Sequence, residues 1–200
     1  MKQVLHIAAS PRGAVSHSRQ AAEQALAALQ ARSPIEVILR DLSEQPLPHP
    51  DATFVSASLM PPEQRSPSHR LSLSLSEALI AELQAADAVL ISTPMHNFML
   101  PSVLKAWVDH VLRPGRSFAR TPLGKQGLLT DRPVAMLMAC GGAIGNGDQQ
   151  DFASPYMAYA CQTMGLHNFQ SIILENCNRD AAARASSLTS LQKWQQGWPW

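Results

Sequence analysis

The hydrophobic positions of this chain fall into short apolar runs that alternate with longer segments in which apolar residues recur every three or four positions. Short apolar runs are typical of strands buried on both faces of a parallel sheet, and the longer spacing is typical of amphipathic helices. The predicted strands are 4–9, 35–39, 88–91, 133–138 and 169–174. The predicted helices run from Ser16 or Ser18 to about 32, and over 67–86, 103–112, 151–164 and 179–194.

Five strands alternating with helices predict an α/β fold, a flavodoxin-like doubly wound three-layer sandwich with a five-stranded parallel sheet. No internal repeat or clear linker divides the chain, so residues 1–200 are expected to form a single domain. Two segments do not fit the alternation: the proline- and serine-rich connection Ser43–Pro67 and the excursion Ser117–Gly127, which is expected to be irregular. Connections this long are usually functional or interfacial.

The loop after the first strand carries Ser10, Ser16 and Ser18 and leads into a helix. A helix N-terminus offers free N–H groups and the positive end of a dipole, which makes this loop a candidate phosphate site. It is neither a Walker A loop nor Gly-x-Gly-x-x-Gly, and the absence of a lysine favours a phosphate that is bound rather than transferred. The alternative is an ordinary capped turn, for which either Ser16 or Ser18 is a suitable N-cap.

Two further loops are expected at the same edge of the sheet, where open α/β sheets bind their ligands. After the third strand, Met95, Asn97 and Phe98 offer a soft apolar group, an amide and an aromatic ring, which suit a flat heteroaromatic ligand. After the fourth strand, Gly141 and Gly142 open a glycine-rich stretch that lets the backbone approach a ligand closely. The alternatives are an ordinary strand-to-helix connection and a flexible turn.

Composition excludes several classes of protein. The chain is 46% hydrophobic with a formal net charge of +1 and no long basic stretch, which argues against binding to nucleic acid. No apolar run is long enough to span a membrane, and we expect a cytoplasmic protein. The three cysteines lack metal-ligand spacing and fit a reducing compartment, so no metal is expected. His6 is expected to be packed in the core, and Cys140 to be a packed residue and not a nucleophile.

At these loops the sequence resembles the FMN-dependent NADH azoreductases, also described as NADH:quinone oxidoreductases, from Val4 to about Arg179. The segment Pro94-Met95-His96-Asn97-Phe98 is similar to the family's Pro-Met-Tyr-Asn-Phe, and Gly141-Gly142 also matches. The resemblance implies a homodimer with the active site at the subunit interface. It implies FMN as cofactor, NADH or NADPH as co-substrate, and a quinone or azo substrate. The implied FMN-binding residues are Ser10, Ser16, His17, Ser18, Met95, His96, Asn97, Phe98, Ala139, Cys140, Gly141 and Gly142.

The chain departs from the family pattern at several of these positions. His96 stands where tyrosine is usual, and Ala139-Cys140 where Ser-Arg is usual. Arg120 and Thr163 fall near positions that are often aromatic in relatives and wall the substrate pocket, which leaves the substrate range open. No catalytic residue is certain: His96 is a candidate proton donor, with the alternative that it only contacts the ribityl chain or solvent.

Two other classes of function remain to be weighed. One is a flavodoxin-type electron carrier, which docks its partners through a strongly acidic surface; 15 acidic against 16 basic residues make such a surface hard to build. The other is a flavin-binding module without turnover. At the C-terminus, Trp198 and Trp200 are expected to be exposed and to dock on another surface.

Overall fold

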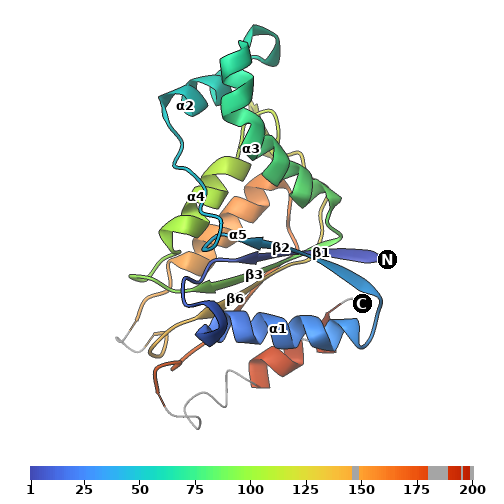
Figure 1. Ribbon diagram of the computed structural model, residues 1–200, viewed down its shortest axis with the longest axis vertical. Helices are drawn as coiled ribbons and strands as arrows, with labels where there is room; N and C mark the ends of the chain where they lie inside the picture. The colour runs from blue at the N-terminus through green and yellow to red at the C-terminus, as the bar shows by residue number, and fades with distance from the viewer. Residues whose placement is uncertain (146–148, 180–188, 195, 199–200) are drawn as a thin grey trace.

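The computed structural model describes residues 1–145, 149–179, 189–194 and 196–198. Five parallel strands form its main sheet, in the order β2-β1-β3-β6-β7 (Figure 1). This order confirms the predicted flavodoxin-like doubly wound fold, with the strand predicted over 35–39 at an edge. The strands are β1 (Lys2–Ala8), β2 (Ile35–Asp41), β3 (Ala88–Pro94), β6 (Val134–Ala139) and β7 (Phe169–Leu174).

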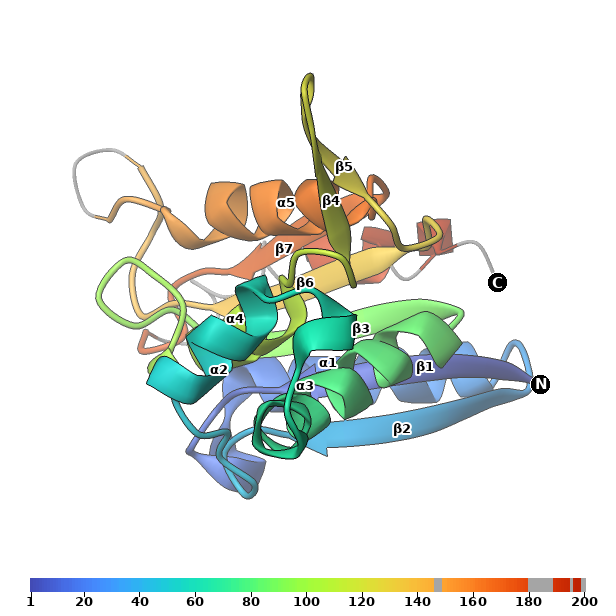
Figure 2. The same ribbon diagram turned by 90° about the horizontal axis from the view of Figure 1, so that it is seen from above.

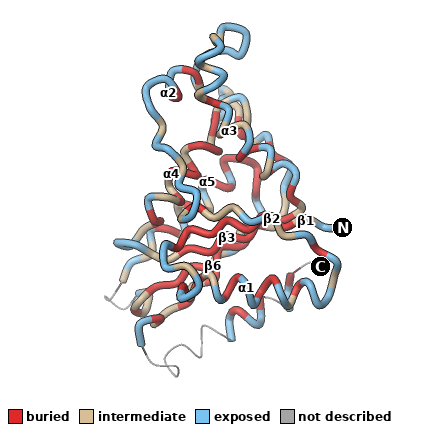
Figure 3. Tube along the Cα trace, viewed as in Figure 1, coloured by how far each residue is buried: buried red, intermediate tan, exposed pale blue. Residues whose placement is uncertain are grey.

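Helices cover both faces of this sheet. Figure 1 shows α1 (His17–Gln30) on one side, and α3 (Pro67–Ala85), α4 (Ser102–Val111) and α5 (Ala153–Met164) on the other. Side chains alternate along β1, so that Leu5 packs in the core under α3 to α5 while Val4 packs in the core under α1. Burial on both faces explains why the central strands are nearly continuous apolar runs, and Figure 3 shows the buried positions following them.

The helix ends follow the capping residues that the sequence offers. Ser16 is the N-cap of α1, and its hydroxyl oxygen accepts the Arg19 N–H. Ser66 caps α3 in a capping box with His69, and Pro67 takes the first helical position. Gly165 follows α5 in the left-handed conformation at φ 97°, so the helix ends at residue 164 as predicted.

The excursion at 117–127 is not irregular, which corrects the sequence prediction. It forms an antiparallel hairpin of β4 (Phe118–Thr121) and β5 (Gly124–Gly127), which Figure 2 shows projecting beside α5. Gly124 makes the turn possible at φ 118°, a conformation that most residues avoid. The long connection before α3 contains a further helix, α2 (Ala52–Leu59), which begins at the N-cap Asp51.

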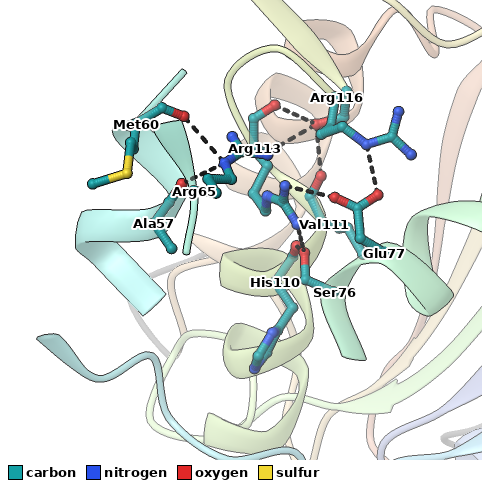
Figure 4. A network of polar contacts seen from close by, with 10 residues as sticks. Ala57, Met60, Arg65, Ser76, Glu77, His110, Val111, Arg113 and Arg116 are labelled. Carbon is teal, nitrogen blue, oxygen red and sulfur yellow. Dashed lines mark hydrogen bonds and ion pairs between the residues drawn. The ribbon is translucent and has the colours of Figure 1, made fainter. Parts of the chain in front are cut away.

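A buried arginine ties α3 to the end of α4 (Figure 4). The guanidinium of Arg113 is 1% exposed and donates to Ser76 Oγ at 2.9 Å and to Glu77 Oε1 at 2.8 Å. Arg116 Nε donates to the other carboxylate oxygen of Glu77 at 2.7 Å. Burial opposes ionisation of Glu77, but the hydrogen bonds and charges of the two arginines outweigh it and lower the pKa of that carboxyl. This network holds the base of the hairpin against the helical layer.

The C-terminal tail corrects a second prediction. Trp198 is only 6% exposed and packs edge to face on Trp194, with ring centroids 4.9 Å apart, in the core under α1. Trp200 and most of the helix predicted over 179–194 lie outside the described residues. In α3, Leu79 and Leu83 are buried as expected, but Leu71 is 76% exposed. Within the described part of the chain, no helix has the length and apolarity to cross a bilayer.

Candidate functional site

The loops after β1, β3 and β6 border one cleft of about 190 Å³ at the carboxyl edge of the sheet. The structure therefore brings together segments that the sequence leaves up to 130 residues apart, as expected where the strand order reverses. Eight of the twelve residues expected at the cofactor line it. They are Ser10, Ser16, His17, Met95, His96, Ala139, Cys140 and Gly141. Asn97, Phe98 and Gly142 lie in the same loops, and Ser18 lies in the first turn of α1, but these four residues do not line the cleft.

The first loop forms a polar cradle at the N-terminus of α1. Ser10, Ser16 and Ser18 are all buried, and the hydroxyl oxygens of Ser16 and Ser18 are 3.1 Å apart. The Ser18 N–H, in the first turn of the helix, has no acceptor among the described residues. Hydroxyl groups, a free N–H group and the positive end of the helix dipole form a donor set suited to an anion.

An ion pair below this cradle fixes the first turn of α1 to the end of β2. Arg19 approaches Asp41 at 2.6 Å, with both side chains 12% exposed. The other oxygen of Asp41 accepts the N–H groups of Ser43 and Glu44. Burial opposes ionisation of Asp41, but these hydrogen bonds, led by that from Arg19, lower the pKa of its carboxyl. The helix N-terminus is thus held in place before any ligand arrives.

The loop after β3 closes in a tight turn. His96 and Met99 exchange two backbone hydrogen bonds of 2.9 and 3.0 Å, which leaves Asn97 and Phe98 as the central residues at φ 48° and 68°. Positive φ is common for asparagine but unusual for phenylalanine. Phe98 is also 50% exposed, and its carbonyl oxygen accepts the N–H of Phe152, a second exposed aromatic residue. A strained, exposed aromatic residue beside a cleft indicates a binding role, since packing does not account for it.

Replacing Phe98 with asparagine tests this interpretation. Asparagine tolerates the left-handed backbone, so the free energy of unfolding should not fall. Removal of the aromatic face should weaken binding of a flat aromatic ligand by about tenfold or more, measured by titration beside chemical denaturation. A loss of stability with unchanged ligand affinity would show that Phe98 serves packing alone.

The glycine loop after β6 is fastened to its neighbours by backbone contacts. Met95 N–H donates to the carbonyl of Ala139 at 2.8 Å, which joins the second and third loops. Gly141 lies so close to Asn178 that a Cβ at position 141 would be 2.6 Å from the Asn178 side-chain nitrogen. The N–H groups of Asn97, Gly141 and Gly142 have no acceptor among the described residues. These are free backbone donors at the rim of the cleft.

The sequence did not predict two parts of the cleft lining, namely the loop after β7 and Arg12. Cys177 and Asn178, in the loop after β7, also line the cleft, as do Arg12 and Pro94. The available signal was positional: the fifth predicted strand ends at the same edge of the sheet as the others. Arg12 was visible in the first loop, but nothing in its spacing distinguished it from a solvated arginine.

Three other expectations can be compared with the structure. His6 is a packed core residue, with Nε2 at 2.9 Å from Ser92 Oγ; burial, aided by the charge of Arg19, lowers its pKa to about 4, so the ring is neutral. Cys140 is buried, and burial raises its pKa to about 12, which fits a packed thiol. Arg120 is exposed on β4. The described residues contain no cluster suited to a metal ion.

Comparisons with known proteins agree with this architecture. A family model described as a flavodoxin-like fold matches residues 2–197. The chain is 46% identical over 197 residues to FMN-dependent NADH:quinone oxidoreductase 2 of Cupriavidus pinatubonensis, covering 97% of this chain and 96% of that one. It is 42% identical to FMN-dependent NADH:quinone oxidoreductase 4 of Pseudomonas fluorescens, with 93% and 90% covered. A crystal structure of azoreductase from Bacillus anthracis superposes with a TM-score of 0.87 at 24% identity, covering 98% of both chains, and shows the same fold.

The chain therefore belongs to the flavodoxin-like family that includes these FMN-dependent NADH:quinone oxidoreductases. The resemblance seen in the sequence is confirmed over nearly its whole length.

Proposed function

We propose that this protein is an FMN-dependent oxidoreductase that transfers reducing equivalents from NADH or NADPH to quinones, azo compounds or both, by a two-step exchange at one site. The single observation that carries the proposal is the cleft itself. It joins an anion cradle at the N-terminus of α1 to free backbone donors and an aromatic loop, at the edge where this fold binds ligands. Relatives that match nearly the whole chain are named FMN-dependent NADH:quinone oxidoreductases, which supports the cofactor, the NADH donor and the quinone acceptor.

The residues present fit FMN. The N-terminus of α1 with Ser10, Ser16 and Ser18 supplies the donor set for the phosphate. The loops at Met95–Phe98 and Ala139–Gly142 would flank the isoalloxazine ring and ribityl chain, with His17 beside the phosphate. When bound, the flavin accepts hydride from a nicotinamide and passes reducing equivalents on.

The protein contributes position and charge stabilisation. The free N–H groups of Asn97, Gly141 and Gly142 are suited to donate to the polar edge of the ring and to stabilise negative charge there. The exposed aromatic faces of Phe98 and Phe152 offer stacking surface to a flat substrate. The Arg19–Asp41 ion pair and the backbone hydrogen bonds of the loops hold these groups in place before a ligand binds. This reduces the conformational entropy that is lost on binding.

Arg12 extends the phosphate site in this proposal. It lines the cleft, and its guanidinium has no acceptor among the described residues. A charge-assisted hydrogen bond to phosphate is worth about 1.5–3 kcal/mol. Arg12→Gln should therefore raise the Kd for FMN about tenfold while leaving the Kd for riboflavin unchanged, measured by quenching of flavin fluorescence. Equal weakening of both flavins would contradict a phosphate contact.

A substitution at His96 tests whether this residue donates a proton or only contacts the cofactor. His96 lines the cleft, where its imidazole is placed to reach a bound substrate. If His96 donates a proton to the product, His96→Gln should lower kcat for quinone reduction by about tenfold and flatten the alkaline limb of the pH–rate profile, because a general acid acts in its protonated form. An unchanged profile would leave His96 as a contact to the ribityl chain.

We also place the active site at the interface of a homodimer. Five of the exposed apolar side chains occur on α2, on the first turns of α3, at the hairpin turn and on α5, which are elements on the side of the sheet opposite α1 (Figures 1 and 2). Exposed apolar residues gathered on one side favour a protein partner. They are Val55, Leu59, Leu71, Leu123 and Tyr159. Sedimentation equilibrium should give twice the mass of one chain; a monomer would reject this part of the proposal.

The overall proposal is tested by turnover. NADH oxidation that needs both added FMN and a quinone or azo acceptor, with parallel-line kinetics for the two substrates, is expected for exchange at one site. A flavodoxin-type carrier or a binding module would bind FMN without oxidising NADH. We further propose a cytoplasmic location, which the three thiols, none of them in a disulfide, support.

A further inference from the structure

Two of the three cysteines meet in the wall of the cleft. Cys140 follows β6 and Cys177 lies in the loop after β7, and both line the cleft. The third, Cys161, lies in α5 within the core on the opposite side of the sheet from α1. Cys140 stands where the azoreductase family usually has arginine, so the cysteine pair is a feature of this chain.

The backbone holds the pair in register. The N–H of Cys177 donates to the carbonyl oxygen of Cys140 at 3.0 Å, which keeps the two Cα atoms within about 7 Å of each other. Both sulfur atoms approach a single oxygen, the carbonyl of Leu174: Cys140 Sγ at 3.7 Å and Cys177 Sγ at 3.1 Å. The sulfurs therefore also lie within about 7 Å. Disulfides span Cα separations of about 4.4–6.8 Å, so a bond requires rotation of the side chains and little movement of the backbone.

A single left-handed residue produces this arrangement. Asn176 takes φ 58°, so the chain bulges after β7 and returns Cys177 to the carbonyl of Cys140. The N–H of Asn176 donates to the carbonyl of Gly142 at 3.1 Å, and Glu175 accepts the N–H of Ile144. The loop after β7 is thus fastened to the glycine loop along its length, and the two cysteines are presented to each other from fixed backbones.

We propose that Cys140 and Cys177 form a reversible disulfide whose formation is coupled to occupancy of the cleft. The oxidant is hydrogen peroxide. The Cys140 sulfur attacks a peroxide oxygen, the O–O bond breaks, and a sulfenic acid at Cys140 and water form. The second thiol then displaces the sulfenic oxygen, the S–S bond forms, and a second water leaves. Both thiol hydrogens end in water, and the two electrons lost by sulfur reduce the peroxide.

Disulfide formation is coupled to occupancy of the cleft through the hydrogen bond that the Cys140 thiol makes in the reduced protein. The Cys140 thiol donates to the carbonyl of Gly142 at 3.2 Å, within the loop proposed to flank the flavin. A disulfide withdraws this donor and moves the sulfur along the cleft wall, so the oxidised protein should bind FMN less well. By thermodynamic linkage, bound FMN disfavours the disulfide by the same factor. This step rests on the proposed function, whereas formation of the bond itself does not.

The environment of the Cys140 thiol determines how fast it is oxidised. Burial raises its pKa to about 12, with further contributions from the neighbouring Cys177, Glu175 and Asp151. The thiolate is the reactive form, so below this pKa its share rises tenfold for each pH unit. Oxidation should be slow at neutral pH and accelerate about tenfold per unit as the pH rises.

The test is oxidation of the purified full-length protein with hydrogen peroxide at alkaline pH, with and without saturating FMN. Peptide mapping by mass spectrometry should find a Cys140–Cys177 cross-link that a dithiol reverses. Cys161→Ser is the matched control and should keep the cross-link, because this thiol is equally buried but lies in the other core. Cys177→Ser should abolish it and leave oxygen adducts on Cys140. FMN should slow the cross-link about fivefold or more.

Three results would overturn the proposal. The first is a folded wild type that forms no cross-link under conditions in which the denatured chain forms one. The second is a cross-link that involves Cys161. Equal rates with and without FMN, in protein whose flavin fluorescence proves FMN bound, would disprove the coupling. Failure of FMN to bind at all would instead count against the proposed function, because the cross-link in the protein without FMN is measured independently.

Discussion

Ser16→Asp should abolish tight FMN binding in a protein that still folds. Aspartate caps helices as well as serine does, so α1 should keep its N-terminus. Residue 16 is buried, so the desolvation of the carboxylate should offset the gain from the helix dipole and leave only a small change in the free energy of unfolding. The new carboxylate would occupy the anion cradle and repel the phosphate. Two like charges about 4 Å apart near a protein surface cost about 4 kcal/mol, so we expect the Kd for FMN to rise at least a hundredfold.

A second N-cap in the chain supplies the matched control. Ser66 caps α3 in the same way and is not among the residues lining the cleft, so Ser66→Asp should leave FMN affinity unchanged. Flavin fluorescence titration and urea denaturation of both variants separate the two effects. If Ser16→Asp binds FMN as the wild type does, the phosphate does not lie at the N-terminus of α1.

Gly127→Ala should strongly destabilise the protein. A Cβ at position 127 would lie 2.2 Å from the backbone nitrogen of Gly165 and 2.3 Å from its Cα, where no side chain can turn aside. The contact joins the end of β5 to the end of α5, beside the hydrogen bond from Leu129 N–H to the carbonyl of Met164. Forcing these backbones apart should cost about 3 kcal/mol or more.

The measurement is the free energy of unfolding from urea denaturation. Gly197→Ala is the control, because a Cβ there meets nothing within 4 Å and the residue is helical. This control should be neutral or slightly stabilising. If Gly127→Ala unfolds at the same urea concentration as the wild type, the hairpin is not packed on α5 as described.

The hydrophobic pattern was sufficient to predict the main sheet, because its central strands β1, β3 and β6 are buried on both faces and are therefore nearly continuous apolar runs. The hairpin at 118–127 could not be predicted in this way. Its strands are four residues each, Lys125 and Gln126 of β5 are both exposed, and the hairpin packs on α5 through the close tertiary contact between Gly127 and Gly165. Trp198 was misjudged for a similar reason: the core under α1, on which it packs together with its neighbour Trp194, is not visible in the local sequence.

The cleft could be predicted in outline, because the parallel topology brings the ends of consecutive strands to one edge. The loops themselves carried recognisable chemistry, such as Asn97 and Phe98 after β3. The contribution of the loop after β7 could not be read from the sequence, because it depends on the left-handed Asn176, which returns Cys177 to Cys140. The burial of Arg113 was also hidden, since its partners Ser76 and Glu77 lie more than 30 residues earlier.

The central claim is that the cleft binds FMN and passes electrons through it. The most direct test is an anaerobic absorption spectrum of the purified protein with FMN, before and after NADH and then a quinone. We predict flavin bands that are perturbed on binding, bleach with NADH and recover with the quinone. Bands that stay unbleached would identify a carrier or a binding module, and a spectrum of free flavin alone would mean that this chain shares only the fold of its relatives.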